Sequence, residues 1–260
     1  MAQISWLLRL FFKNLKPPQP SANVWAFGMA SKRSEVRCSY LRTSTHSQTH
    51  GFLYVCVSYH FRMLDTLRQY ISGFVSLTNE EFAALADMLV IRNFDKKQLL
   101  TGAGEVENYL NFLVKGVARK YFYKGKTEII TQIAKEGEFI NSSASFLSGA
   151  PSPYIVETLE PSTFLSITRQ QLEKLYENSP RIERLGRIAI THLFLQREEW
   201  EHECLRLDTR QRFLHFVQNN PDLLQRVPQK YLASYLNMKP ETFSRLKHLV
   251  QRPRAAARQK

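Results

Sequence analysis

The sequence predicts an α+β fold, in which a jelly-roll or barrel of short antiparallel strands lies between helical segments. Three observations support this prediction. Between residues 90 and 167 apolar and polar residues alternate, with turn signals every eight to twelve residues. From 180 to 207 the apolar residues recur mostly three, four or seven apart, as in one long helix. Residues 228–250 then read as two short helices, each opening with proline.

The chain has 260 residues and a net charge of +13, with a pI near 9.7. Such a charge favours a polyanionic partner, and nucleic acid is the first candidate. The charge is unevenly distributed, however. Residues 1–62 contain eight Lys and Arg and one acid, a net +7, which leaves +6 for residues 63–260. The globular part is therefore only moderately basic.

Residues 1–62 differ from the remainder, because they are almost free of acids and show no lasting periodicity. We expect either an extension outside the fold or upstream sequence, with Met63 as the natural start, in preference to a targeting segment. Cys38, Cys56 and Cys204 lack the spacing of a zinc or iron–sulfur site, and a disulfide framework is not expected, which fits a reducing cytoplasm. No apolar run of eighteen residues exists, so no membrane span is expected.

The regular patterning begins near Met63. Residues 63–89 have helical spacing, and Thr78 with Glu81 forms a capping box at a helix start. The segments that alternate as strands are 109–114, 117–123, 127–133, 154–159 and 163–167. The first three are joined by tight glycine turns, which indicates an antiparallel meander.

Thr168 can cap a short helix, and Ser179-Pro180 begins a long one of roughly 27 residues, about 40 Å. Its apolar positions include Leu185, Ala189, Leu193 and Trp200. Two interpretations are open, a dimerisation seam and a helix packed on its own domain. The length favours dimerisation.

The last helix pair runs from about Pro228 to Leu236 and from Pro240 to Val250, around a turn at 237–239. Apolar residues at 232, 233, 236, 243, 246 and 250 can pack the two helices together. The polar residues left facing outward on the second helix are Glu241, Thr242, Ser244, Arg245 and His248. Spacing alone allows two interpretations equally, a DNA-binding helix-turn-helix and an ordinary helical hairpin.

Three motifs carry a resemblance to the Crp/Fnr family of bacterial transcription regulators. They are the strand–Lys-Gly–strand step at 114–117, the Gly-Glu-Phe-Ile step at 137–140 and the Glu-Thr-Phe-Ser-Arg run at 241–245. The resemblance covers about residues 63–250. It implies a double-stranded β-helix sensor domain over 63–179, a dimerisation helix over 180–207, a winged-helix-like helix-turn-helix domain over 208–250 and a basic tail over 251–260.

By this resemblance Glu241 and Arg245 fall at base-contacting positions, which suits their chemistry, since Arg reads guanine and Glu accepts from cytosine. Thr242 and Ser244 are expected to bond phosphates, and Lys239 to meet one at the helix start. His248 is a further candidate for DNA contact. Where this family often has a basic residue before the Glu, this chain has Pro240, so the specificity is expected to differ.

The effector pocket departs from the pattern of cyclic-nucleotide binders. Asn141-Ser142 stands where a Gly-Glu pair grips the ribose, and Ser152 or Pro153 where an Arg grips the phosphate. Without that charge-assisted bond we expect cyclic AMP not to bind tightly. The candidate pocket residues are Phe139, Asn141, Ser142, Ser152 and Tyr154. Residues 141–145 could equally form a solvated loop or a helix-start cap.

We therefore expect a cytoplasmic, non-enzymatic, sequence-specific transcriptional regulator that acts as a homodimer and has a degenerate sensor domain. The expected partners are double-stranded DNA with a near-palindromic operator, a second copy of the chain, RNA polymerase and an unknown small-molecule effector. No cofactor, metal or membrane partner is expected. The alternative is a ligand-sensing module that acts through a protein partner.

Overall fold

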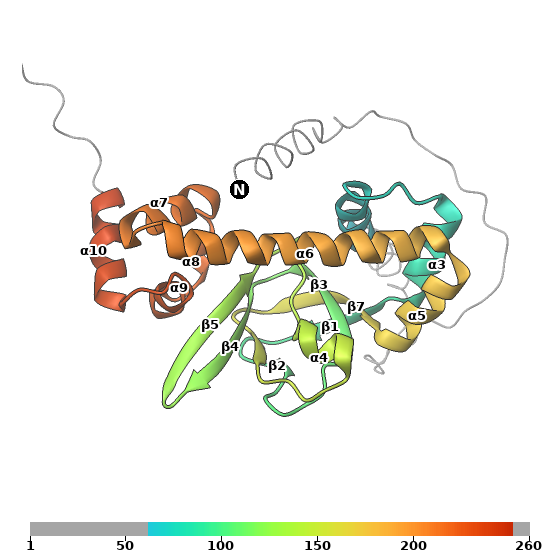
Figure 1. Ribbon diagram of the computed structural model, residues 1–260, viewed down its shortest axis with the longest axis horizontal. Helices are drawn as coiled ribbons and strands as arrows, with labels where there is room; N and C mark the ends of the chain where they lie inside the picture. Colours follow the sequence, from blue (N-terminus) through green and yellow to red (C-terminus); the bar gives the residue numbers. More distant parts are fainter. Residues whose placement is uncertain (1–61, 252–260) are drawn as a thin grey trace, which may run out of the picture. The chain divides into compact units, whose positions relative to one another are not determined.

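The computed structural model describes residues 62–251, of which 63–251 belong to a compact unit that begins at Met63 (Figure 1). The expectations for residues 1–61 and for the tail beyond 251 lie outside the described residues. A helix over 62–72 is followed by α3 (Asn79–Met88). The capping box predicted at Thr78 and Glu81 is present, with each side chain bonded to the other's backbone N–H.

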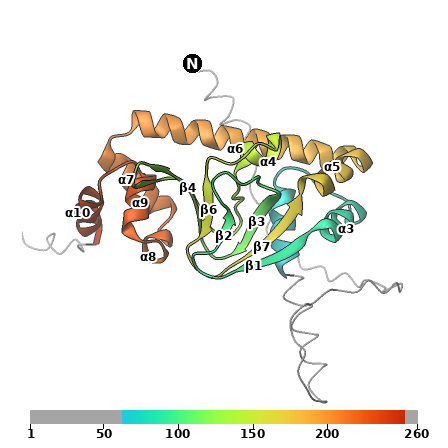
Figure 2. The ribbon, with the colours of Figure 1, turned by 90° about the horizontal axis from the view of Figure 1, so that it is seen from below.

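Seven strands form two antiparallel sheets in the described residues (Figure 2). The first sheet has the order β1-β7-β3 and the second β2-β6-β4-β5. The bounds are β1 Val90–Phe94, β2 Leu99–Thr101, β3 Tyr109–Lys115, β4 Ala118–Lys124, β5 Thr127–Ala134, β6 Ile155–Thr158 and β7 Ser162–Thr168. A short helix, α4 (Ser143–Ser148), follows β5. The two sheets form a β-roll, as the alternating pattern predicted, although β1 and β2 were not recognised as strands in the sequence.

The inside of the roll is closed by a small apolar cluster drawn from both sheets, namely Leu113, Ala118, Ala134, Ile140, Val156 and Phe164. The turn between β3 and β4 requires glycine. Gly116 has φ of 107°, and a Cβ placed there would lie 2.8 Å from Cα of Ser162. This close approach explains the Lys-Gly step of the motif at 114–117.

The outer face of the first sheet packs against the N-terminal helices, α5 (Arg169–Asn178) and the start of α6 (Pro180–Arg206). Phe112, Leu165 and Ile167 supply the sheet side of this core. Met63, Leu67, Ile71, Leu175, Ile182 and Leu185 supply the helical side. The 27 residues of α6 match the predicted long helix.

The outer face of the second sheet packs against the C-terminal helices (Figure 1). These are α7 (Thr209–Asn219), α8 (Leu223–Arg226), α9 (Gln229–Tyr235) and α10 (Pro240–Gln251). Side chains of Val117, Tyr121, Ile130 and Ile133 on the roll join a single apolar cluster with those of Phe213, Phe216, Leu232, Leu236 and Phe243. The roll and the C-terminal helices therefore share a core.

No helix in residues 62–251 is long and apolar enough to cross a membrane.

Candidate functional site

Two short helices, α9 and α10, present a polar face on a rigid apolar base. The turn between them places Asn237 at φ of 51°, a left-handed conformation that asparagine tolerates. The Met238 N–H donates to the Ala233 carbonyl at 2.9 Å and closes the turn. Phe243 is fully buried and its ring contacts that of Phe213 edge-on at 5.2 Å. The base is thus fixed by packing.

The opposite side of α10 is open. Glu241, Arg245 and His248 are exposed, as is Lys239 just before the helix, while Thr242 and Ser244 are half-buried. None of these six side chains forms a hydrogen bond or ion pair within the described residues. The structure therefore brings the predicted DNA-contacting residues together on one segment, with their polar groups available to a partner. The side chain of Val250 lies outside the described residues.

A buried arginine fixes the C-terminal helices to the end of α6. Arg212 on α7 is 7% exposed and donates to three carbonyl oxygens, those of Leu236, Cys204 and Leu207, at 2.8–3.0 Å. Carbonyls at helix ends are otherwise unpaired, so one guanidinium satisfies acceptors from α6 and α9 together. Trp200 adds a ring stacked on Tyr235 at 4.5 Å. The orientation of the helix pair therefore follows that of α6.

A second set of polar contacts joins the helix pair to the roll. The Ser234 hydroxyl accepts from the Ile130 N–H and donates to the Glu128 carbonyl, both at 3.0 Å. Arg119 on β4 lies 3.9 Å from the ring centre of Tyr231. The same guanidinium is paired with two carboxylates of the roll, those of Glu128 and Glu157.

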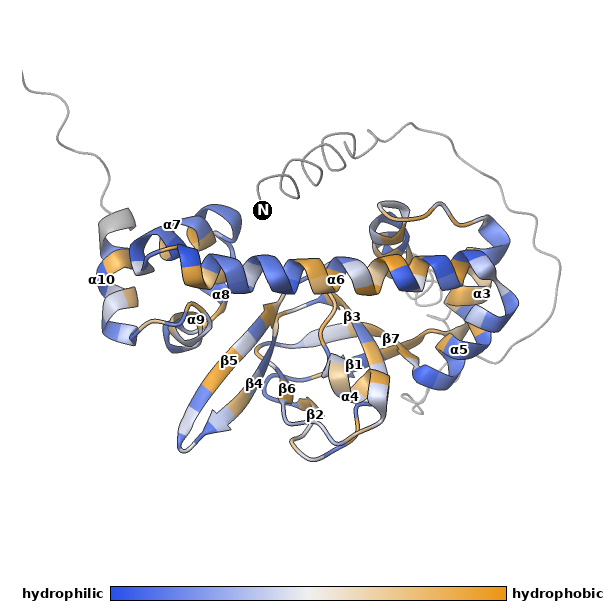
Figure 3. Cartoon of the chain, viewed as in Figure 1, coloured by the Kyte–Doolittle hydropathy of each residue, from blue (hydrophilic) through white to orange (hydrophobic). Residues whose placement is uncertain are grey.

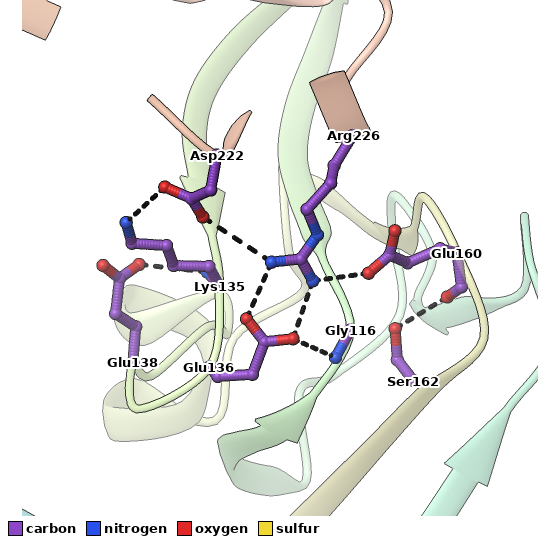
Figure 4. A network of polar contacts seen from close by, with 8 residues as sticks. All are labelled: Gly116, Lys135, Glu136, Glu138, Glu160, Ser162, Asp222 and Arg226. Atoms are coloured by element: carbon purple, nitrogen blue, oxygen red, sulfur yellow. Dashed lines mark hydrogen bonds and ion pairs between the residues drawn. The ribbon is translucent and has the colours of Figure 1, made fainter. Parts of the chain in front are cut away.

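A third contact, centred on Arg226 at the end of α8, is shown in Figure 4. Its guanidinium pairs with Glu136 after β5 at 2.6 Å and with Glu160 before β7 at 2.5 Å. Asp222 pairs with Lys135 at 3.0 Å beside it. Burial pushes the pKa of Glu136 upward most strongly, but the bonds from Arg226 and the backbone outweigh it and leave the pKa lowered. Ionised Glu136 is thus the form that the folded chain favours.

The predicted effector residues divide into two groups. Asn141, Ser142 and Ser152 are buried and Tyr154 is half-buried, all near the open end of the roll. Phe139 instead contacts the rings of Tyr70 and Phe112 in the core outside the roll. Because neighbouring residues of an extended segment point to opposite sides, Ile140 faces inward and Phe139 outward. Phe139 is therefore corrected from a pocket residue to a core residue.

The stretch at 141–145 is a helix start, since Ser142 is the N-cap residue of α4. The interpretation as a solvated loop is wrong, because Asn141, Ser142 and Ser145 are all buried. The Ser142 hydroxyl makes no capping bond, and it is a buried side-chain oxygen without a partner in the described residues. The Ser152 hydroxyl bonds only to the backbone of Tyr154, while the backbone of Ser152 bonds to that of Gly104 and Glu105.

Two ionisable residues of the roll interior were missed in the sequence. Glu107 is 3% exposed and accepts from the Thr101 hydroxyl and the Tyr109 N–H, and burial raises its pKa. Lys120 stands opposite Gln132 and Val156, and Val156 belongs to the interior cluster, so Lys120 faces inward as well. The alternation of residues 117–123 indicates that Lys120 lies on the same face as the apolar Ala118. The adjacent basic pair Arg119-Lys120, however, is also typical of a solvent-exposed strand.

The predicted dimer seam on α6 lies on the inward side of the helix. Leu185 is buried in the core beside the first sheet and Trp200 packs on Tyr235, while Ala189 and Leu193 are half-buried. The exposed apolar residues of this helix are Ile190, Phe194, Leu195 and Leu205. Figure 3 shows apolar segments along the middle of α6 between charged ones.

Residues 91–179 match the model of the cyclic nucleotide-binding domain. This segment, which comprises most of the β-roll and α5, is therefore similar to a cyclic nucleotide-binding domain. A comparison with curated proteins gives no match.

Solved structures share the fold of this chain. The chain matches the c-di-GMP-responsive global regulator CLP of Xanthomonas campestris with a TM-score of 0.54 and 15% identity, over 67% of this chain and 92% of that one. It matches FixK2 of Bradyrhizobium japonicum with a TM-score of 0.53 and 18% identity, over 62% of this chain and 84% of that one. It matches a CooA mutant of Carboxydothermus hydrogenoformans with a TM-score of 0.50 and 16% identity, over 64% of this chain and 77% of that one. The predicted resemblance to Crp/Fnr regulators is thus confirmed in domain and fold.

The Arg226 contact yields a prediction on stability. Arg226→Gln should lower the free energy of unfolding at pH 7 by about 1–2 kcal/mol, a modest figure because these side chains are about a third exposed and solvent screens them. Since the folded-state pKa of Glu136 is lowered, the stabilisation is complete above the unfolded pKa, about 4.3, and is lost as pH falls through the folded value.

Urea denaturation of the parent and the variant at pH 7 and pH 3.5 measures this difference. The matched control is Arg181→Gln, which removes the longer pair of a half-exposed arginine with Glu81 at 3.6 Å and should change stability less than Arg226→Gln does. Equal stability of parent and Arg226→Gln at pH 7 would show that the contact contributes nothing.

Proposed function

We propose that this chain is a sequence-specific DNA-binding transcriptional regulator that acts as a homodimer. The observation that carries the proposal is the polar face of α10, where Glu241 and Arg245 are exposed and unpaired while Phe243 between them is fully buried. A helix-turn-helix enters the major groove with such a face, anchored from behind and free in front. The domain match and the Crp/Fnr-like fold support the same function.

On DNA, each side chain of this face has a role that its chemistry suits. Arg245 reads guanine through two parallel N–H bonds, and Glu241 accepts from the amino group of cytosine. Lys239 stands before the first turn of a 12-residue helix, where its charge and the helix dipole together favour a phosphate. Thr242 and Ser244 are half-buried, so we assign them to the DNA backbone and not to bases.

Dimerisation uses the outward side of α6 in this proposal. Ile190 and Phe194 are one turn apart on that helix and are 48% and 59% exposed. A pair of large apolar residues at this spacing forms the centre of a helix–helix seam. Two copies paired along α6 would present two α10 helices, which we expect to engage half-sites about 34 Å apart, one turn of DNA.

The sensor domain of this proposal is not a tight cyclic AMP receptor. Residues 149–154, where an arginine would grip the cyclic phosphate, contain no cation. The hydroxyl of Ser152 is already engaged with the backbone of Tyr154. A cyclic phosphate held at residues 149–154 would find no charged donor there and would lose a strong bond, so we expect cyclic AMP to bind weakly in that position.

Selection from random DNA tests the specific role of Arg245. The parent chain should enrich a two-fold motif at about 0.1 M salt, where nonspecific attraction is screened. Arg245→Ala should lose about 1–3 kcal/mol of binding free energy on the best site and tolerate any base at one position of each half-site. Arg184→Ala, an exposed arginine near the start of α6, is the control and should leave the motif intact.

If Arg245→Ala bound the selected site as tightly as the parent, its assignment as a base reader would be wrong.

A single substitution tests the dimer. Phe194→Glu places a charge at the centre of the proposed seam, so the chain should sediment as a monomer at micromolar concentration where the parent is a dimer. Leu99→Glu, at a similarly exposed residue of β2, is the control and should stay dimeric. A dimeric Phe194→Glu would move the interface away from this side of α6.

A further inference from the structure

Lys120, inside the β-roll, forms no ion pair with any residue that the structure describes. Its ammonium group donates to the Asn141 carbonyl at 3.3 Å and lies 5.7 Å from the ring centre of Tyr154. No ion pair of residues 62–248 includes Lys120. Arg119, one position earlier on the same strand, is by contrast paired with two carboxylates. A cation inside a fold is normally paired, so this one calls for an explanation.

A second positive charge approaches the same place from α6. Burial, and after it the charge of Arg197, lowers the pKa of Lys120 to about 8. Glu107 opposes this effect, but its carboxylate accepts from the Thr101 hydroxyl and from the N–H groups of Tyr109 and Ser142, and it forms no hydrogen bond or ion pair with the lysine. Arg197 is exposed and likewise takes part in no ion pair of the described residues. Two positive charges that act on each other in this way repel, and an anion close to both would relieve the repulsion.

The side chains near Lys120 have the chemistry to contact a small organic molecule. Phe122 and Tyr154 meet edge-on at 6.0 Å and supply an aromatic surface. Ser142, next to the Asn141 carbonyl that holds the ammonium group, is 1% exposed and has the hydroxyl without a partner. A buried hydroxyl with nothing to bond to costs free energy, which a ligand oxygen would recover.

We propose that Lys120 and Arg197 bind the anionic group of a small effector, a carboxylate or a phosphate, inside the β-roll. The aromatic side chains of Phe122 and Tyr154 contact the body of that molecule, and the Ser142 hydroxyl bonds one of its oxygens. The inference takes from the proposed function only the assumption that the roll senses a ligand. Ligand binding is measured without DNA, so a failure of the anion-site proposal can be distinguished from a failure of the DNA-binding proposal.

The test uses the full chain and three probes of one size, namely benzoate, phenyl phosphate and the neutral benzyl alcohol. Benzoate, phenyl phosphate or both should raise the melting temperature in a saturable way, and the stronger of the two identifies the anionic group. Benzyl alcohol should have no effect. If neither anion raises the melting temperature, or if benzyl alcohol raises it equally, the anion site is wrong.

Variants then locate the site by calorimetric titration with the stronger anion. Lys120→Gln should weaken binding about ten- to a hundredfold, because a charge-assisted bond is lost. Lys124→Gln, exposed at the end of the same strand, should bind as the parent does. Arg197→Gln keeps the test valid if the Lys120 variant does not fold, since Arg197 is exposed, and it too should bind more weakly. Unchanged affinity in both variants would place the anion elsewhere.

The pH dependence separates a charge role from a packing role. With the pKa of Lys120 near 8, affinity for the fully ionised probe should be constant below pH 7 and fall about tenfold per pH unit above 8, as the ammonium group loses its proton. Lys120→Gln should show no such fall. A parent whose affinity is the same at pH 7 and pH 9.5 would contradict the role of Lys120.

Discussion

The structure depends on one apolar contact, between the outer face of the second sheet and the C-terminal helices. Ile130 and Ile133 of β5 share a cluster with Leu232 of α9 and Phe243 of α10, and three of these four side chains are under 5% exposed. Burying a side chain of this size contributes about 1.5–3 kcal/mol. The recognition surface of α10 is therefore built directly on the sensor domain, since its inner side and the strands of the roll are parts of one core.

Polar contacts around the edge of this core fix the orientation of the C-terminal helices on the roll, while the apolar core supplies most of the binding between them. Arg119 is only 3% exposed at its side chain, and removing one member of such a buried pair typically costs about 3–5 kcal/mol, because the other charge is left unpaired. Its contact with Tyr231, the Ser234 bonds to β5 and the Arg226 pairs each accept one geometry. A ligand that shifted β4, which carries both Arg119 and Lys120, would act on the helix pair through this edge.

Much of the fold could be predicted from local sequence, because local chemistry determined it. The capping boxes at Thr78 and Thr168 and the proline after Ser179 begin helices where predicted. The three-residue β2 and the four-residue α8 are too short to show a period. The dimer seam that the sequence predicts on α6 lies on the inward side of the helix. That helix is apolar on two sides, and only the packing shows that Leu185 is covered and Phe194 is not. Lys120 was missed because a charge inside a roll contradicts the usual pattern.

Differential scanning calorimetry of residues 63–260 tests the shared core most directly. If the roll and the C-terminal helices are one cooperative unit, they unfold in a single transition whose calorimetric and van't Hoff enthalpies agree. Two separate transitions, or a calorimetric enthalpy well above the van't Hoff value, would show that the helix pair is only loosely attached to the roll, and the direct coupling of α10 to the sensor domain would then be wrong.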